Sequence, residues 1–439
     1  MKKFLSSVKN KFAGWFPFDT KENIKRSVLK VLVIIDVIFL LFAVVYLCGA
    51  LAYSLTNKYS LTDKYPEFYE GIFSDFSQIG FYALRRDAFS MEVGSSYSAF
   101  FLLLMYPFAL IFKKDINVAE ELYGLNFDEP QNLVIISSWR FWVSYLLFYA
   151  VCFVLLYFVT RAYIKKHNLE INRVFLVFLL SGPTIFTMIR GNMLFPALIL
   201  TMVFLCWHDS KNPVLVELSI LSLAVAGVLK LYPLIFCVFL LKDKKWFQVV
   251  RLALYFAIFY IVPCFCFEGG VKAYIHNLLN FSVGESDLRY VTMKNLSFTS
   301  IVYKILFAPA VALGVKHYAV FDWISVAFAI ALLVFIFITS IRTQSHFKTC
   351  LLCLCAIILV PPVSYSYSLT FLWIVFLTYF KDFSAHSMKQ NLIFLISTLI
   401  VYILPISWFG QIVISILFIV LTFVTGVSVF KEKKLEVDK

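Results

Sequence analysis

The sequence predicts an all-α polytopic membrane protein, a helical bundle of about twelve membrane spans. Three observations indicate this fold class. Of the 439 residues, 61% are hydrophobic and only 15% are charged, whereas soluble domains carry about 25% charged residues. Apolar segments recur from residue 31 to residue 430, and a spanning helix needs about 20 apolar residues. Clusters of Lys and Arg alternate between the two ends of successive segments, as in helices that cross a bilayer repeatedly.

The chain is predicted to be a single integral-membrane domain over residues 1–439. Residues 1–30 form a basic segment, which the positive-inside rule places in the cytoplasm. The first span then leads into a long external loop over residues 56–137. We expect this loop to carry amphipathic helices, because apolar and charged residues are mixed along it.

Residues 97–112 look like a second span but are predicted not to cross the membrane. They would end at Lys113 and Lys114, and the next apolar segment also ends in basic residues. Two successive spans cannot both end in the cytoplasm. Residues 97–112 are short for a span, and Pro107 interrupts them. We therefore keep this segment in the external loop as a non-spanning helix.

The remaining segments alternate in charge and include a second long external loop over residues 268–319. Residues 431–439 form a cytoplasmic tail, and an even number of spans places both termini in the cytoplasm. The net charge of +13 fits the positive-inside bias and contact with anionic lipid headgroups. It does not indicate nucleic-acid binding. The His residues are scattered without metal-ligand spacing. Cys350 and Cys353 form a CxxC, but it opens an apolar helix with no second pair nearby, so we predict neither a metal nor a cofactor.

Two cations stand against the positive-inside bias, because Arg190 and Lys230 lie at predicted external ends of spans. Snorkelling to the outer headgroups would explain either one alone. Together with Lys294 in the second external loop, they suggest a fixed anion. A lipid-linked phosphate is the natural candidate, because it arrives within the membrane at that depth.

Short motifs follow one another in an order that resembles a known family. "SDF" follows the first span, and then come a Tyr-to-Pro helix at residues 97–107, "RGN", "KLYP", an "NLS" that opens a helix, and the late turn "PPVSYSYS". This order resembles the polytopic GT-C glycosyltransferases, and most closely glycosyltransferase family 87. Members of that family use polyprenyl-phosphate mannose. The resemblance covers most of residues 75–367 and implies a GT-C-like bundle.

The resemblance implies roles for individual residues. Asp75 corresponds to the family's catalytic base, and "RGN" and "KLYP" supply Arg190, Asn192 and Lys230. Asp87 is a rival base, but two adjacent arginines suggest a solvated charge cluster there. The chain departs from the family in lacking a Tyr-Pro-Pro cluster near residue 97 and in placing Tyr where Trp and His are usual in the late turn.

Sugar transfer from a phosphate-linked donor needs a base, cations for the leaving phosphate, and side chains that bind both sugars. We assign the base to Asp75 and the phosphate to Arg190, Lys230 and Lys294. The substrate-binding candidates are Tyr97, Asn192, Asn295, Tyr365 and Tyr367.

The resulting expectation is an inverting transferase that moves a hexose, with mannose favoured, from a polyprenyl-phosphate donor to a glycan or glycolipid acceptor. The reaction would take place on the outer face of a bacterial plasma membrane. Two alternatives stay open: a transporter or flippase of lipid-linked glycans, and a capsule or O-antigen polymerase.

Overall fold

A computed structural model describes residues 73–91, 94–124, 127, 129–169, 181–279, 295–307, 319–381 and 408–437, and the isolated positions 30, 33, 34, 37, 41, 393, 397, 398 and 401. Over these residues the chain forms helices and a single isolated β-bridge, with no strand. The prediction of an all-α membrane protein is confirmed. Lys294, almost all of the segment 1–30 and residues 56–72 lie outside the described part.

Four helices are long and apolar enough to cross a membrane: α8 (Trp139–Lys166), α14 (Trp246–Ile261) continued by η3 (Val262–Cys266), α18 (Ala319–Arg342) and α22 (Trp408–Val437). We call them the long outer helices. They expose large apolar side chains, such as Leu146, Val250 and Val424, as lipid-facing helices do. Helix α22 runs on to Val437, so the tail predicted from residue 431 begins inside a helix.

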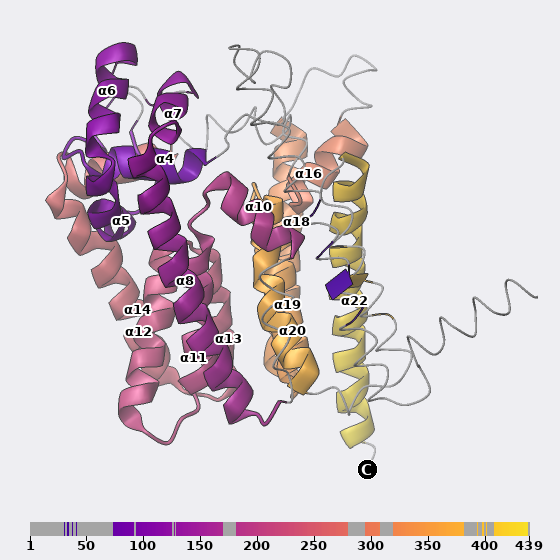
Figure 1. Ribbon diagram of the computed structural model, residues 1–439. Coiled ribbons are helices and arrows are strands. Elements are labelled where there is room, and N and C mark those ends of the chain that lie inside the picture. The colour runs from indigo at the N-terminus through magenta and orange to yellow at the C-terminus, as the bar shows by residue number, and fades with distance from the viewer. Residues whose placement is uncertain are drawn as a thin grey trace, which may run out of the picture.

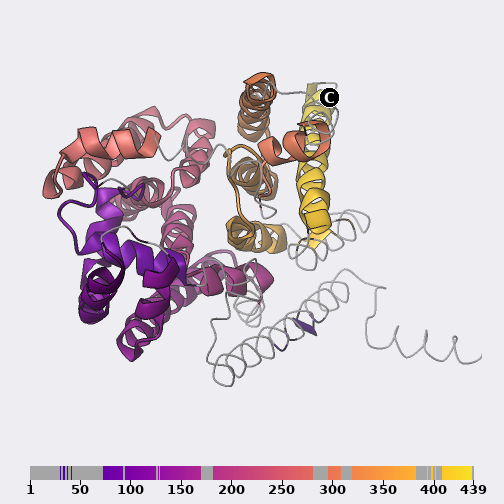
Figure 2. The same ribbon diagram turned by 90° about the horizontal axis from the view of Figure 1, so that it is seen from above.

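A second group of helices is shorter and more buried, and we call these the short inner helices. They are α11 (Leu194–Trp207), α12 (Pro213–Leu229), η2 (Tyr232–Cys237) with α13 (Val238–Lys242), α19 (His346–Leu359), and η5 (Ser366–Phe371) with α20 (Leu372–Lys381). Seen from above, α19 and α20 lie between the α8–α14 group and α22 (Figure 2). The number of twelve spans stays a prediction, because these helices are shorter than a usual span.

Four further helices gather at one end of the bundle, which we call the site end: α4 (Ser74–Ala83), α5 (Ala99–Ile111), α6 (Lys113–Tyr123) and α7 (Glu129–Ile136) (Figure 1). Helix α5 has 13 residues and contains Pro107, which fits the predicted non-spanning helix. Its length of about 20 Å is less than the hydrocarbon thickness of about 30 Å. The side of the membrane on which these helices lie stays a prediction.

Ion pairs hold this end together. Arg140 at the start of α8 donates two hydrogen bonds to Asp115 of α6, at 3.0 Å and 2.7 Å. Arg85, which follows α4, contacts Glu120 of α6 at 2.6 Å. A two-pronged Arg–carboxylate contact fixes orientation as well as distance. Helices α4, α6 and α8 are therefore held in a defined arrangement.

An aromatic cluster fixes α4 on the bundle. Phe76 is fully buried, and its ring lies between 5.4 and 6.0 Å from four others, those of Phe112, Phe141, Tyr145 and Phe148. Burying such a side chain contributes about 1.5–3 kcal/mol, and well-oriented ring pairs add to this. Because Asp75 precedes Phe76 in the chain, the cluster also fixes the position of that carboxylate.

Three smaller elements complete the described fold: α10 (Gly182–Arg190), α16 (Phe298–Val302) and η4 (Tyr303–Phe307). Residues 270–279 are also helical. Helix α10 packs against η5 and leads directly into α11. It therefore brings the "RGN" motif to the site end.

Candidate active site

Most of the predicted site residues come from three turns between helices and from α4, while Tyr97 precedes α5, Asn295 precedes α16 and Tyr367 lies in η5. The first turn is residues 190–192 between α10 and α11, the second contains Lys230 between α12 and η2, and the third is residues 360–365 between α19 and η5. Each turn joins short inner helices or leads into one. Segments that are far apart in the sequence therefore meet at one end of the bundle.

Asp75 lies in the first turn of α4 and is 8% exposed. Its Oδ1 is 3.3 Å from Nε of Arg190. Its Oδ2 accepts a hydrogen bond from Nδ2 of Asn192 at 2.5 Å. The structure thus joins the "SDF" and "RGN" motifs, as their predicted shared site requires. An ionised carboxylate has about four lone-pair positions, so both contacts leave acceptor capacity on Asp75.

Gly191 makes this approach possible. Its φ of 70° is left-handed and caps α10, a conformation that glycine adopts without steric cost. A Cβ at this position would lie 3.1 Å from both the Cα and the carbonyl oxygen of Phe73. The N–H of Phe73 donates to the carbonyl of Ile189 at 2.8 Å. The start of α4 and the end of α10 are therefore in direct backbone contact.

Two tyrosines of α8 hold the same turn, and the sequence analysis did not identify them. The hydroxyl of Tyr145 donates to the carbonyl of Met188 at 2.6 Å, and that of Tyr149 donates to the carbonyl of Asn192 at 3.0 Å. The available signal was their spacing of four residues, which places both hydroxyls on one face of an otherwise apolar helix. Buried Tyr hydroxyls usually find a polar partner.

Lys230 caps α12 in an extended backbone conformation and is half-buried. Its Nζ lies 5.9 Å from the ring centroids of both Tyr97 and Tyr367. At this distance the ring quadrupoles attract the ammonium group. The rings of Tyr365 and Tyr367 are 5.5 Å apart. One predicted phosphate ligand and three predicted substrate-binding residues are thus neighbours.

Electrostatics link this group to Asp75. Burial tends to lower the pKa of Arg190, but the charge of Asp75 and the nearby phenols of Tyr367, Tyr97 and Tyr365 raise it, and the net shift is upward. The site therefore presents a guanidinium charge beside the carboxylate of Asp75 and the three phenols.

The side chain of Asn295 forms hydrogen bonds with the backbone of the third turn. Its Oδ1 accepts hydrogen bonds from the N–H groups of Ser297 and Ser364, both at 2.9 Å, and its Nδ2 donates to the carbonyl of Pro362 at 3.0 Å. It also forms an isolated β-bridge with Tyr365. This geometry gives Asn295 a positioning role for the turn, and its predicted contact with substrate stays a prediction.

The rival base Asp87 is bound by arginine. Arg85 donates to its two oxygens at 3.0 Å and 2.8 Å, and this hydrogen bonding lowers the pKa of Asp87. Asp87 therefore belongs to the ion-pair network of the site end. Across the described ranges, no group of three or more His, Cys, Asp or Glu is placed to hold a metal ion, and the metal-free site stays a prediction.

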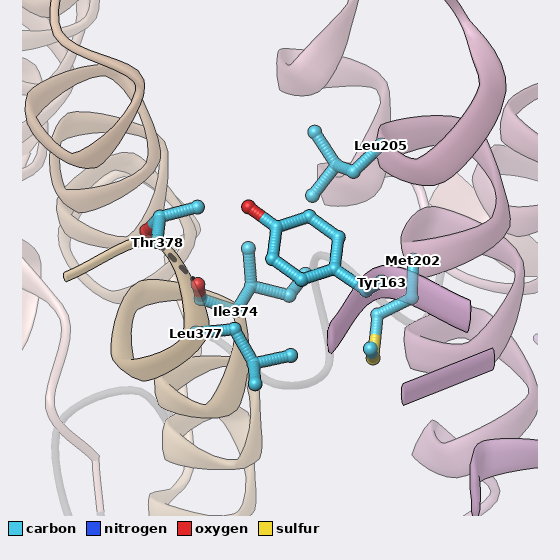
Figure 3. Close-up of a pocket in the computed structure, with 6 residues that line it drawn as sticks. All are labelled: Tyr163, Met202, Leu205, Ile374, Leu377 and Thr378. Atoms are coloured by element: carbon cyan, nitrogen blue, oxygen red, sulfur yellow. Dashed lines mark hydrogen bonds between the residues drawn. The ribbon is translucent and has the colours of Figure 1, made fainter. Parts of the chain in front are cut away.

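A small crevice lies elsewhere in the bundle, between α8, α11 and α20 (Figure 3). Its volume is about 10 Å³, which is room for a single water. Tyr163, which lines it, is about 21 Å along α8 from Tyr149 at the usual helical rise. The crevice is therefore separate from the Asp75 site. Its other lining residues are Met202, Leu205, Ile374, Leu377 and Thr378.

Comparisons with curated proteins and with solved structures give no match. A family model, that of glycosyltransferase family 87, matches residues 96–364, more than half of the chain. The match includes Tyr97, Arg190 and Lys230, and its ends leave out Asp75 and Tyr365. The matched segment thus supplies both cations of the site and the family resemblance predicted from motif order is confirmed. The chain belongs to glycosyltransferase family 87 and is a glycosyltransferase.

Proposed function

We propose that the protein transfers a hexose, with mannose favoured, from a polyprenyl-phosphate donor to a glycan or glycolipid acceptor, and that it inverts the anomeric configuration. The observation that carries this proposal is the contact between Asp75 and Arg190, with Nε 3.3 Å from Oδ1. A general base and a cation for the leaving group are thus side by side. Lys230 and the tyrosines around it complete the set of groups that the reaction requires.

The reaction follows from these positions. Asp75 takes the proton of the acceptor hydroxyl, and the acceptor oxygen forms a bond to the anomeric carbon on the face opposite the phosphate. The bond between that carbon and the phosphate oxygen breaks, and its electron pair leaves with the polyprenyl phosphate. One displacement inverts the configuration. A positioned base typically contributes about 10²–10⁴-fold to such a rate.

Arg190 and Lys230 would stabilise the negative charge that develops on the leaving phosphate. Charge-assisted hydrogen bonds to phosphate are roughly twice as strong as neutral ones, and they act best where the donors are held in place. Arg190 also contacts Asp75, so one guanidinium would fix the base relative to the donor. The ring faces of Tyr97 and Tyr367 are suited to pack against a sugar.

The lengths of the helices support a lipid-linked donor. Helix α11 begins two residues after Asn192 and has 14 residues, so it is about 21 Å long. Helix α8 has 28 residues and is about 42 Å long. Tyr145 and Tyr149, which contact the "RGN" turn and its neighbour Met188, lie about 9 and 15 Å along α8 from its start, which supports a position of the turn below that end of α8. A phosphate on a membrane-anchored polyprenol would lie at such a depth.

The polymerase alternative predicts a different product, whereas family membership argues against a transporter. The purified protein should be incubated with radiolabelled polyprenyl-phosphate mannose and an alkyl mannoside acceptor. We expect a product longer by one sugar, with the anomeric configuration of the donor inverted. A ladder of longer products would favour the polymerase, and absence of transfer would reject the proposed donor class.

The outer-face location, with both termini in the cytoplasm of a bacterial cell, is tested by labelling cysteines from outside. Lys114 in α6 and Lys165 near the end of α8 are both exposed and lie at opposite ends of α8's length. Each is changed to Cys in a Cys266→Ser background, because Cys266 is exposed. We expect Lys114→Cys to react with an impermeant maleimide in intact cells, and Lys165→Cys to react only after permeabilisation. The reverse pattern would overturn the orientation.

A further inference from the structure

We infer that Thr187 and Thr370 form a positioning pair, which fixes the position of the "RGN" turn relative to the segment that carries Tyr365 and Tyr367. This inference rests on the proposed function. The hydroxyl oxygens of the two residues are 2.8 Å apart although 183 positions separate them in the chain. Thr187 belongs to α10 and Thr370 to η5. Both side chains are buried, with exposures of 0% and 1%.

Each threonine contacts a residue of the site or its neighbour, Thr187 through its backbone carbonyl and Thr370 through its hydroxyl. The carbonyl oxygen of Thr187 accepts a hydrogen bond from the N–H of Asn192 at 2.9 Å, and the hydroxyl oxygen of Tyr149 lies 3.4 Å from it. The hydroxyl of Thr370 is 2.6 Å from the carbonyl oxygen of Tyr367. The pair therefore joins the residue that holds Asp75 to the tyrosine that lies beside Lys230.

The count of hydrogens shows why the contact between the hydroxyls matters. Each hydroxyl has one hydrogen to donate, and the carbonyls of Pro183 and Tyr367 are acceptors at 2.7 Å and 2.6 Å. If one hydroxyl donates to its carbonyl, the other hydroxyl is able to donate to that oxygen. The two residues thus share a single hydrogen-bonded network inside an apolar interface, where such bonds are strong and unmade ones are costly.

A buried threonine elsewhere in the bundle provides the matched control. Thr201 in α11 is 0% exposed, and its hydroxyl donates to the carbonyl of Ala197 one turn earlier, at 2.7 Å. Thr187 makes the same bond within its own helix, to Pro183 at 2.7 Å. The added contact with Thr370 is the feature under test. Replacing each Thr by Val removes the hydroxyl and keeps the shape.

The functional test uses radiolabelled polyprenyl-phosphate mannose and an alkyl mannoside with Thr187→Val, Thr187→Ser, Thr370→Val and Thr201→Val. We expect Thr187→Val to raise the KM for the donor about three- to tenfold, as loss of one buried neutral hydrogen bond implies. The KM for the acceptor should change by less than about twofold, because the displaced turn carries Arg190, which is assigned to the donor phosphate. Thr187→Ser keeps the hydroxyl and should retain the wild-type KM, as should Thr201→Val.

The double variant of Thr187→Val with Thr370→Val shows whether the two substitutions act through their shared contact or independently. We expect it to resemble either single variant, because each already removes the shared contact. Equal losses in Thr187→Val and Thr201→Val, or a loss in Thr187→Ser as large as in Thr187→Val, would overturn the inference.

Thermal unfolding tests the contact between Thr187 and Thr370 without relying on activity. If the wild-type protein does not use the donor, the proposed function fails. The Tm values of the two single variants and the double variant still test the pair. A smaller Tm loss in the double variant than the sum of the single losses supports it, and strict additivity overturns it.

Discussion

The long outer helices and the short inner helices are built from similar apolar residues but bury them very differently. Within their most apolar stretches, only 17% of α14, 33% of α18, 39% of α22 and 44% of α8 is buried inside the protein. By contrast, every residue of α20 from Leu372 to Phe380 is buried. The long helices therefore present much of their apolar surface to the lipid, whereas the short ones are covered by other helices of the bundle.

The difference teaches how a membrane enzyme places a polar site. A helix of about 20 residues matches the bilayer, and its ends reach both surfaces. A helix of 10–17 residues does not, so its turns lie inside the outline of the longer ones. All three turns of the candidate site join short inner helices or lead into one. The charged residues are thus carried at a depth that an ordinary span would leave apolar.

The largest expected effect concerns the carboxylate at the site end. Asp75→Asn removes the proposed base and should lower kcat by about 10²–10⁴-fold while the protein still folds and inserts. Asp87→Asn is the matched control, because Asp87 is also paired with an arginine near the end of α4. It should keep turnover within about tenfold of wild type, since it breaks a partly exposed ion pair only. Near-normal turnover of Asp75→Asn would reject the base assignment.

The second largest effect is expected for the cations at the turns of the short inner helices, which should affect donor use, unlike a cation at the end of a long outer helix. Arg190→Gln and Lys230→Gln each remove a charged contact worth about 1.5–3 kcal/mol, so donor use should fall at least about tenfold by the usual conversion. Acceptor affinity should change much less.

Arg140→Gln is the control for these two variants. Arg140 pairs with Asp115 at the start of α8, and its loss leaves a mostly buried carboxylate without its ion pair. We expect a lower Tm with unchanged donor KM. If Arg140→Gln weakened donor use as much as Arg190→Gln, the two classes of cation would not be distinct.

The burial difference itself can be tested with two leucines. Leu352 in α19 is fully buried and Leu254 in α14 is 55% exposed. Leu352→Ala should lower the free energy of unfolding by about 2–5 kcal/mol, whereas Leu254→Ala should change it by about 0.5 kcal/mol or less. Unfolding in detergent micelles measures both. Equal losses would show that α14 is covered by protein rather than by lipid.

The last expected effect lies at the other end of α8 and concerns pH. Burial, and then the charges of Lys381 and Lys166, lower the pKa of His167 to about 4, from an ordinary value of about 6.5. The unfolded chain binds this proton more readily, so stability should fall as the pH drops from about 6.5 towards 4. In His167→Gln that part of the pH dependence should disappear. Parallel curves for both proteins would contradict the shift.

The sequence was sufficient to predict some of the residues that the structure brings together, because its signals were positional, while their roles stay predictions. Arg190 and Lys230 were noticed since they stand at helix ends where the charge rule disfavours cations. Motif order added Asp75, and the structure brings it to Arg190. Position at a helix end and motif order can be read from the sequence without knowing which helices pack against each other.

Hydrogen-bond partners could not be predicted in the same way. Asn192 was expected on substrate, yet its amide is bound to Asp75, and the amide of Asn295 is bound to the backbone of residues 362–364. Tyr145 and Tyr149 were not noticed at all. These contacts depend on distances between segments more than 30 residues apart. The number of membrane spans was hard to predict for a related reason. A usual span has about 20 residues, whereas helices such as α19 have only 14.

The docking of α4 on Gly191, and of η5 on α10, also sets when the enzyme becomes complete during its synthesis. Asp75 leaves the ribosome first, and the "RGN" turn follows more than 100 residues later. Thr370 follows Asp75 by 295 residues, which is about 15–60 s at ordinary translation rates of about 5–20 residues per second. On this assignment, a chain that has been inserted only a little past Lys230 carries its base and its two cations without Tyr365 and Tyr367. It cannot consume donor until the late segment with η5 packs against α10.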